Sequence, residues 1–316
     1  MTRSSVGLLG LMLISSWAAT AASPACGADG VAVQVLGSGG PELAAGRAAS
    51  SYLVWHDGRP RVLVDIGGGS AANFGAAGAT VAALDLILLT HLHVDHSGDL
   101  SALVKSSYFQ SRSQPLPVLG PVGQGDFPST TDFLERLFGP EGAFAYLGNY
   151  LPEDGQADAA GYALRPVNIH PPKGQVALVH EAEGVKVSAA RLGHGIVPAL
   201  GWRIDVGGRS VAFSGDTHGD DGVLERLAAD VDLLVAHNAV PESASGAARA
   251  LHMPPSVIGQ IAHRAGAGAV LLSHRMRRTL GREAETRAQA TRFYDGVLTF
   301  ANDLDCIPLR QNADTR

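Results

Sequence analysis

The sequence lacks an excess of basic residues: 24 lysines and arginines stand against 30 aspartates and glutamates, for a formal net charge of -6 at pH 7. Proteins that bind nucleic acid mainly by neutralising phosphates need a basic surface, so we expect no nucleic-acid partner, and a local basic patch is the alternative that stays open. Internal repeats and low-complexity tracts are also missing. With 46% hydrophobic and 17% charged residues, the composition predicts a globular protein with a sizeable core and excludes a disordered chain.

Long apolar runs are absent beyond the N-terminus. Residues 1–22 combine a positive charge at Arg3, the run VGLLGLMLISSWAA and small residues near Ala21 and Ala22, a pattern typical of a signal peptide removed on export. The alternatives are a membrane anchor and an ordinary buried helix, but the run is shorter than the roughly 20 residues needed to span a bilayer, so we expect no membrane span in the mature chain. The sequence therefore predicts a periplasmic or secreted protein.

Cysteine is scarce as well. Only two occur, Cys26 just after the predicted cleavage site and Cys306 near the C-terminus. An even count in an exported protein permits a disulfide between the two ends of the mature chain, and two unpaired thiols are the alternative. The stretch SPAC is a poor lipidation signal, because Ser23 stands where leucine is usual.

Short β-type runs separated by turn residues occur in both halves of the mature chain. VAVQVLG, SYLVW and RVLVDIGGG predict hairpin strands, and LDLILLT at residues 84–90 predicts a strand buried on both faces. Residues 111–175 are richer in proline and glycine, and we expect them to form an insertion over the site within one domain of residues 30–316. The pattern predicts an α/β protein built as a four-layer αββα sandwich.

Residues 90–99, THLHVDHSGD, place three of the chain's 12 histidines and two aspartates in one strand-end segment. Imidazole and carboxylate are ligands that Zn²⁺ favours, so the cluster predicts a metal site. His91 and His93 point to the same side if the local period is two, and Asp95 and His96 could then face a second position. This spacing disfavours the alternative, a purely structural cluster.

With these residues the chain resembles the metallo-β-lactamase superfamily, whose five motifs occur in order: Asp65 in VLVDIGGG, THLHVDH, His194 in RLGHG, Asp216 in FSGDT and His274 in LLSHR. The resemblance implies a hydrolase with two Zn²⁺ or other divalent ions and a metal-bridging hydroxide as nucleophile. One ion would be bound by His91, His93 and His194, the other by Asp95, His96 and His274, with Asp216 bridging both. Asp65 would orient a ligand without binding metal itself.

The stretch HMPPSVIGQIAHRAGAGAVLLSH adds a further candidate, because His252 precedes His274 across one helix and one strand. This arrangement is similar to the phosphodiesterase branch that contains the tRNA 3′-processing endonucleases, in which the equivalent histidine contacts the scissile group. Asp95 and His252 are therefore the candidate catalytic residues, and the alternative for His252 is a cap of the following helix. The short interval from His194 to Asp216 leaves no room for the tRNA-binding arm of those enzymes, and AHNAVPE replaces their HEA-type motif.

Stretches outside the metal motifs, among them PLPVLGPVG and FPSTTDFLERLF, resemble the exported arylsulfatase-type members of the superfamily. From that resemblance we expect an exported hydrolase of sulfate esters that acts on a small anionic substrate. The alternatives are a phosphodiesterase of cyclic or linear nucleotides, then a lactonase or β-lactamase, and, in another class, a non-catalytic metal-binding scaffold. Both a monomer and a homodimer stay open.

Overall fold

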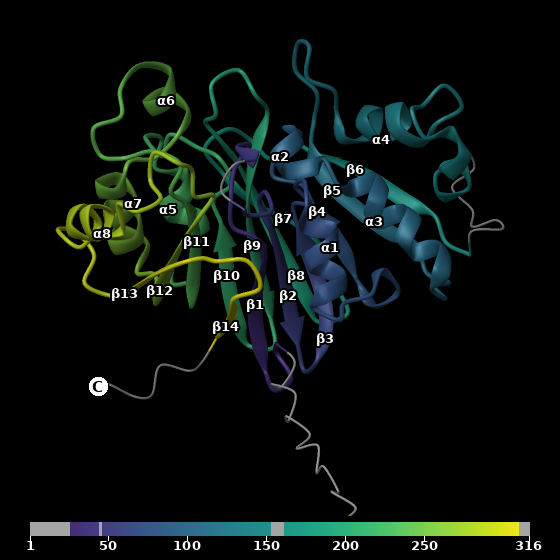
Figure 1. Ribbon diagram of the computed structural model, residues 1–316, viewed down its shortest axis with the longest axis horizontal. Helices are drawn as coiled ribbons and strands as arrows, with labels where there is room; N and C mark the ends of the chain where they lie inside the picture. Colours follow the sequence, from purple (N-terminus) through teal and green to yellow (C-terminus); the bar gives the residue numbers. More distant parts are fainter. Residues whose placement is uncertain (1–25, 44–45, 153–160, 310–316) are drawn as a thin grey trace, which may run out of the picture.

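The computed structural model describes residues 26–43, 46–152 and 161–309, so the predicted signal peptide at residues 1–22 lies outside the described part. Two seven-stranded sheets pack face to face (Figure 1). The first sheet has the spatial order β14 (Cys306–Pro308), β1 (Val31–Gly37), β2 (Ser51–His56), β3 (Arg59–Val64), β4 (Leu86–Leu88), β5 (Leu116–Pro121), β6 (Leu164–Ile169). The second has the order β13 (Val297–Phe300), β12 (Ala269–Ser273), β11 (Leu233–His237), β10 (Arg209–Phe213), β9 (Ala199–Val206), β8 (Val185–Leu192), β7 (Val176–Ala182).

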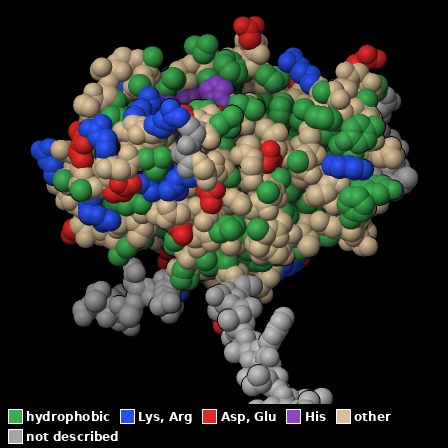
Figure 2. All heavy atoms as spheres, viewed as in Figure 1, with side chains coloured by type: hydrophobic (Ala, Val, Ile, Leu, Met, Phe, Trp, Pro, Cys, Tyr) green, Lys and Arg blue, Asp and Glu red, His purple; other side chains and the backbone are tan. Residues whose placement is uncertain are grey.

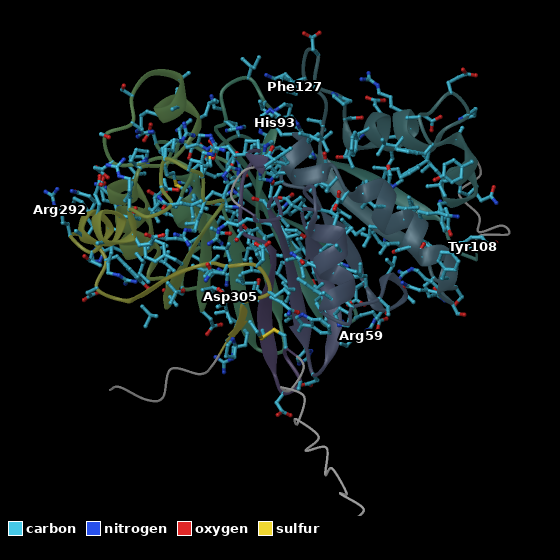
Figure 3. The ribbon with its side chains drawn as sticks, in the orientation of Figure 1. Arg59, His93, Tyr108, Phe127, Arg292 and Asp305 are labelled. Carbon is cyan, nitrogen blue, oxygen red and sulfur yellow. A yellow bond between two sulfur atoms is a disulfide. The ribbon has the colours of Figure 1, made fainter. Side chains whose placement is uncertain are left out.

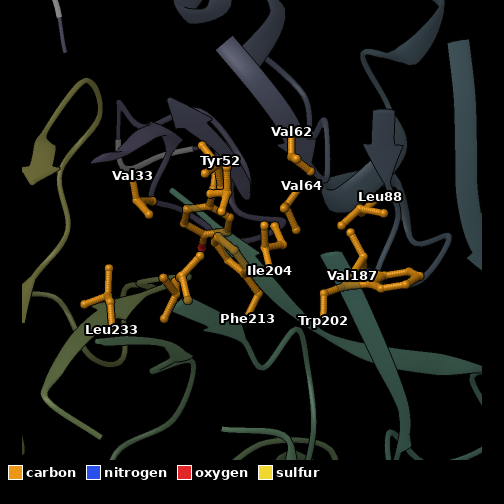
Figure 4. Close-up of a cluster of buried hydrophobic side chains, with 14 of the residues drawn as sticks. Val33, Tyr52, Val62, Val64, Leu88, Val187, Trp202, Ile204, Phe213 and Leu233 are labelled. Carbon is orange, nitrogen blue, oxygen red and sulfur yellow. The ribbon is translucent and has the colours of Figure 1, made fainter. Parts of the chain in front are cut away.

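Alternation of side chains along the strands produces the core between the sheets. In β2, Tyr52 and Val54 belong to the core shared with the second sheet, whereas Leu53 and Trp55 belong to the core on the opposite face. Trp202 of β9 is fully buried in the shared core, and Figure 4 shows it among side chains from both sheets. Each sheet is therefore apolar on both faces, and its outer face needs a cover.

Helices provide that cover on both sides. On the first sheet, Phe74, Leu103 and Leu134 share a core with the outward-facing strand residues; they belong to α1 (Ser70–Ala76), α3 (Leu100–Ser106) and α4 (Thr130–Phe138). On the second sheet the cover consists of α5 (Val223–Leu227), α7 (Pro255–Ala265) and α8 (Glu283–Ala290). The shorter helices are α2 (Val94–Ser97), α6 (Gly246–Leu251), η2 (Val81–Ala83), η3 (Ser107–Phe109) and η4 (Ala145–Tyr150). The predicted four-layer αββα sandwich is confirmed.

Within the described ranges, no helix is both long enough and apolar enough to cross a membrane.

The segment expected as an insertion, residues 111–175, takes part in the first sheet. β5 pairs in parallel with β4 and with β6, so this segment continues the sheet, and α4 covers it. Parallel partners are joined by long connections, so no local turn signal indicates their pairing in the sequence. The strand predicted at residues 84–90 is also shorter in the structure, where β4 covers Leu86–Leu88 and follows the 3-10 turn η2.

A disulfide joins Cys26 to Cys306, whose Cα atoms are 5.6 Å apart (Figure 3). Cys306 begins β14, which pairs with β1 at the edge of the first sheet. The bond therefore ties the first described residues to the last strand of the domain.

Candidate metal centre and active site

The site lies where strands of both sheets end. β3 and β4 are parallel neighbours in one sheet, and β10, β11 and β12 are parallel neighbours in the other. Loops at the carboxyl ends of such strands are where open α/β sheets bind ligands. The structure brings the predicted residues together at this edge: Asp65, His91, His93, Asp95, His96, His194, Asp216, His252 and His274. Figure 2 shows histidine side chains (purple) reaching the surface at the upper edge of the molecule.

One group consists of His91, His93 and His194, whose ring nitrogens lie within 4.8 Å of one another. His91 and His93 come from the turn between β4 and α2, and His91 Nε2 is 3.1 Å from His93 Nδ1. His194 comes from the loop between β8 and β9. Its Nδ1 donates to the carbonyl oxygen of Leu251 at 3.0 Å, which leaves Nε2 free. Three ring nitrogens are thus available to one metal ion.

A second group consists of Asp95, His96, Asp216 and His274. His274 Nε2 lies 3.2 Å from Asp95 Oδ2 and 3.5 Å from Asp216 Oδ1. His96 Nε2 lies 3.6 Å from Asp95 Oδ2 and 3.8 Å from Asp216 Oδ2. The same Oδ2 atom of Asp216 is 3.8 Å from His194 Nε2. This carboxylate therefore lies between the two groups, where one ligand can serve two ions.

The spacing of these atoms fits divalent metal ions. With Zn–N and Zn–O bonds of about 2.0–2.2 Å, ligand atoms at the corners of a tetrahedron lie about 3.3–3.6 Å apart. The second group shows 3.2, 3.5, 3.6 and 3.8 Å. His96 Nε2 is also buried without a hydrogen-bond partner among the described residues, a costly state that coordination to a metal relieves. The cluster is a divalent-metal site.

Asp65 holds His96 in position. Its side chain is fully buried, and its Oδ2 accepts hydrogen bonds from His96 Nδ1 at 2.7 Å and from Thr90 Oγ1 at 2.8 Å. A proton fixed on Nδ1 leaves the lone pair of His96 Nε2 directed at the metal site. Asp65 and His274 have φ of 56° and 52°, in the left-handed region that few non-glycine residues adopt.

His237 is a site residue that the sequence interpretation missed. Its Nδ1 donates to Asp216 Oδ1 at 2.8 Å, and its Nε2 lies 3.1 Å from the hydroxyl of Tyr52. Burial raises the pKa of Tyr52 above its ordinary value, so the hydroxyl stays protonated and donates to Nε2. His237 lies close enough to His96, Asp216 and His274 to join a metal site, but both of its ring nitrogens have partners among the described residues, and these contacts place it to orient Asp216. The available signal was its place at the end of the apolar run VDLLVAHN, a pattern that the metal-site residues share.

His252 faces the carboxylate of Asp216. Its Nδ1 lies 3.8 Å from Asp216 Oδ2, its ring centroid is 5.4 Å from that of His194, and the residue is only 9% exposed. The N-cap of α7 is Pro254, so His252 does not cap that helix. Its Nδ1 has no hydrogen-bond partner within the described part of the chain and is available to a substrate.

Burial and neighbouring charges set the protonation of the site. Burial lowers the pKa of His91 well below its usual range and that of His252 to about 4, so both rings are neutral at neutral pH. For Asp95, burial acts to raise the pKa, but the hydrogen bond to His274 and the nearby imidazoles outweigh it, and the pKa falls to about 2. For His96, burial acts to lower the pKa, but Asp65 together with Asp216 and Asp95 outweighs it, and the pKa rises to about 9. His96 would therefore release a proton on binding a metal ion through Nε2.

Apolar side chains frame the entrance. Val94 and Ile196 are 73% and 74% exposed although each follows closely on a metal-site residue. The ring centroid of Phe127 lies 6.1 Å from that of His93, and Figure 3 shows Phe127 above His93. Exposed apolar surface beside the metal groups suits a substrate that carries an aromatic ring or a nucleobase.

Comparison with known proteins gives a family and several relatives. The model of the Beta-lactamase superfamily domain matches residues 61–275. A ribonuclease Z from Mycobacterium bovis is 30% identical over 285 residues, which cover 86% of this chain and 96% of that protein. Among solved structures, the short form of human tRNase Z covers 88% of this chain at a TM-score of 0.67 and 22% identity, with 99% of its own chain aligned. The metallo-beta-lactamase fold protein YhfI from Bacillus subtilis covers 89% at a TM-score of 0.65 and 22% identity, with 100% of its chain aligned.

These relatives overturn one prediction. The expectation that nucleic acid is not a partner is wrong, because the relatives that match most of this chain are ribonucleases by name. The net charge gave a wrong prediction because it is a sum over the whole surface, whereas binding depends on the charge near the site.

Proposed function

The chain belongs to the metallo-β-lactamase superfamily and is a metal-dependent hydrolase, and we propose that it cleaves phosphodiester bonds of RNA with two zinc ions. The observation that carries this proposal is the position of Asp216, whose Oδ2 lies between two groups of ligands and faces His252. The ribonuclease relatives support the phosphodiesterase alternative, and none of them supports the leading prediction of sulfate-ester hydrolysis.

Each residue has a role that follows from its contacts. His91, His93 and His194 would hold one ion, Asp95, His96 and His274 the other, and Asp216 both. When bound, the ions supply Lewis acidity that polarises the phosphate and activates water. Asp95 is ionised at neutral pH, because its pKa is about 2, so it also accepts a hydrogen bond from the attacking water. His252 is neutral, and it donates an N–H to a phosphate oxygen or to the leaving oxygen.

We also propose that the protein is exported. Support comes from the signal-like residues 1–22 and from the Cys26–Cys306 disulfide, a bond that forms and persists in oxidising compartments. N-terminal sequencing of protein recovered from the expressing cell's exterior or periplasm should find a start near Ala22. Recovery of the whole chain from the cytosol, starting at Met1, would reject export.

The function is tested with zinc-loaded protein on single-stranded RNA, bis(p-nitrophenyl) phosphate, p-nitrophenyl sulfate, a lactone and a cephalosporin. We expect the highest kcat/KM on the phosphodiesters, loss of activity on chelation, and recovery on adding zinc. Faster turnover of the sulfate ester than of either phosphodiester would overturn the proposal, as would full activity in metal-free protein.

His252→Ala tests the reaction centre. It should leave the metal content unchanged and lower kcat and kcat/KM together by roughly 10²–10⁴-fold, because the lost interaction is made chiefly in the transition state. The matched control is His263→Ala, which removes an exposed imidazole from α7 and should retain activity. Near-normal kcat in His252→Ala would remove this residue from the mechanism.

A further inference from the structure

A cavity of about 590 Å³ opens beside the metal centre. Its lining includes Gly193 and Gly195, which flank His194, and Pro121 and His170, at the carboxyl ends of the parallel strands β5 and β6. The cavity therefore lies at the same edge of the sandwich as the metal ligands and shares a loop with them. Its volume is in the range of sites that hold a small molecule, and is larger than a single phosphate group requires.

Positive charge gathers in this cavity although the chain as a whole is acidic. Arg191 and Lys173 line it together with His170 and one carboxylate, that of Asp221, which accepts a hydrogen bond from the backbone of Val223. Neither Arg191 nor Lys173 forms an ion pair with any described residue. The cations are therefore not neutralised from within the described chain.

Arg191 is the most informative of these groups. Its Nη1 lies 3.3 Å from His170 Nε2, and its Nε is buried without a hydrogen-bond partner among the described residues. The side chain as a whole is only partly buried and lines the cavity, so its guanidinium can meet a ligand there, and a phosphate oxygen is the acceptor that an arginine fork matches best. Arg191 is three residues before His194, so their Cα atoms are at most about 11 Å apart.

We propose that this cavity binds the nucleotide next to the scissile phosphate, with its phosphate on Arg191 and Lys173 and its sugar and base against the apolar wall formed by Ile169, Leu192 and Val197. The proposal rests on the proposed function and extends it, because it makes the substrate a strand of linked nucleotides. A substrate with a single phosphate and no neighbouring nucleotide gains nothing from the cavity.

The experiment compares wild type, Arg191→Gln and Lys173→Ala on a single-stranded RNA decamer and on bis(p-nitrophenyl) phosphate, which has one phosphodiester. The matched control is Lys186→Ala, which removes the same charge from the far end of β8, where Lys186 is exposed and paired with Glu181 at 2.9 Å. Arg191→Gln should raise KM for the decamer about tenfold and Lys173→Ala severalfold, with kcat and the turnover of bis(p-nitrophenyl) phosphate changed less than about twofold. The control should match wild type on both substrates.

Equal losses on both substrates with Arg191→Gln, or no loss on the decamer, would overturn the subsite. A separate readout distinguishes this failure from failure of the proposed function: anisotropy of the fluorescein-labelled decamer with metal-free protein. Weaker binding by Arg191→Gln but not by Lys186→Ala supports the subsite even where the wild type cleaves no RNA. Absence of decamer binding by the wild type overturns it.

Discussion

Replacing Asp65 by asparagine tests whether this buried carboxylate sets the metal affinity of the site. Asparagine has nearly the same shape and can still accept a hydrogen bond from Thr90, but it loses the charge that holds His96 Nδ1 at 2.7 Å. The proton of His96 is then no longer fixed on Nδ1. It can move to Nε2, where it blocks coordination of the metal. Loss of such an orienting partner costs roughly 10–100-fold in metal affinity, which is about 1.4–2.7 kcal/mol.

The pH dependence separates the orientation of His96 from its charge. In the wild type, Asp65 helps to raise the pKa of His96 to about 9. Below that pH a proton competes with the metal for His96 Nε2. This competition lowers the apparent metal affinity about tenfold for each pH unit. In Asp65→Asn the largest of the raising charges is gone and only Asp216 and Asp95 still act to raise the pKa of His96, so that pKa falls and a proton competes less with the metal. We therefore expect the zinc affinity of the variant to depend less on pH than that of the wild type. The affinity of the variant should lie furthest below that of the wild type near pH 9 and less far below it toward pH 7.

The assay is competition for zinc against a chromophoric chelator at pH 7, 8 and 9, with far-UV circular dichroism to check the fold. The control is Asp85→Asn, which removes another poorly exposed carboxylate, one that binds Arg59 and Arg61 ahead of β4, away from the metal site. It should leave zinc affinity unchanged. Either unchanged affinity of Asp65→Asn at pH 9 or a deficit that is the same at all three pH values would refute the argument.

Two further changes test the supports of the site. Tyr52→Phe removes the donor to His237 Nε2 and leaves a buried acceptor unpaired, so the free energy of unfolding in urea should fall by about 1–3 kcal/mol, and an unchanged midpoint would contradict the hydrogen bond. Replacing both Cys26 and Cys306 by serine should lower the free energy of unfolding by about 2–5 kcal/mol while zinc content stays the same, and equal stability of the variant and the oxidised wild type would contradict a structural disulfide.

The metal site was predictable from sequence because its ligands follow apolar strands, and each strand end is a local pattern. The motif at residues 90–96 is recognisable in this way, whereas the assignment of His194, Asp216 and His274 to the same site came from the resemblance to the ordered motifs of the superfamily. The four-layer architecture was predictable for the same reason, since continuous apolar runs indicate strands covered on both faces.

Features that depend on long-range pairing were not predictable in this way. The strands β5 and β6 lie in the segment expected as an insertion, because the hydrogen bonds that place β5 beside β4 connect residues far apart in the chain. His237 was missed because its role depends on what each ring nitrogen contacts. Tyr52, which occupies one of those nitrogens, is contributed by the other sheet.

The prediction that nucleic acid is not a partner was wrong for a different reason, because the net charge on which it rested is correct. A net charge of -6 describes the average field far from the molecule, where salt screens it within about 10 Å. A substrate in the site meets the local charges, and the cavity beside His194 presents Arg191 and Lys173 without a carboxylate partner among the described residues. If RNA binds there, raising the salt concentration should weaken decamer binding to the wild type, and Arg191→Gln should reduce that salt dependence by about 0.7 in the slope of log K against log salt, whereas Lys186→Ala should not. A slope that Arg191→Gln leaves unchanged would place the RNA contacts elsewhere on the surface.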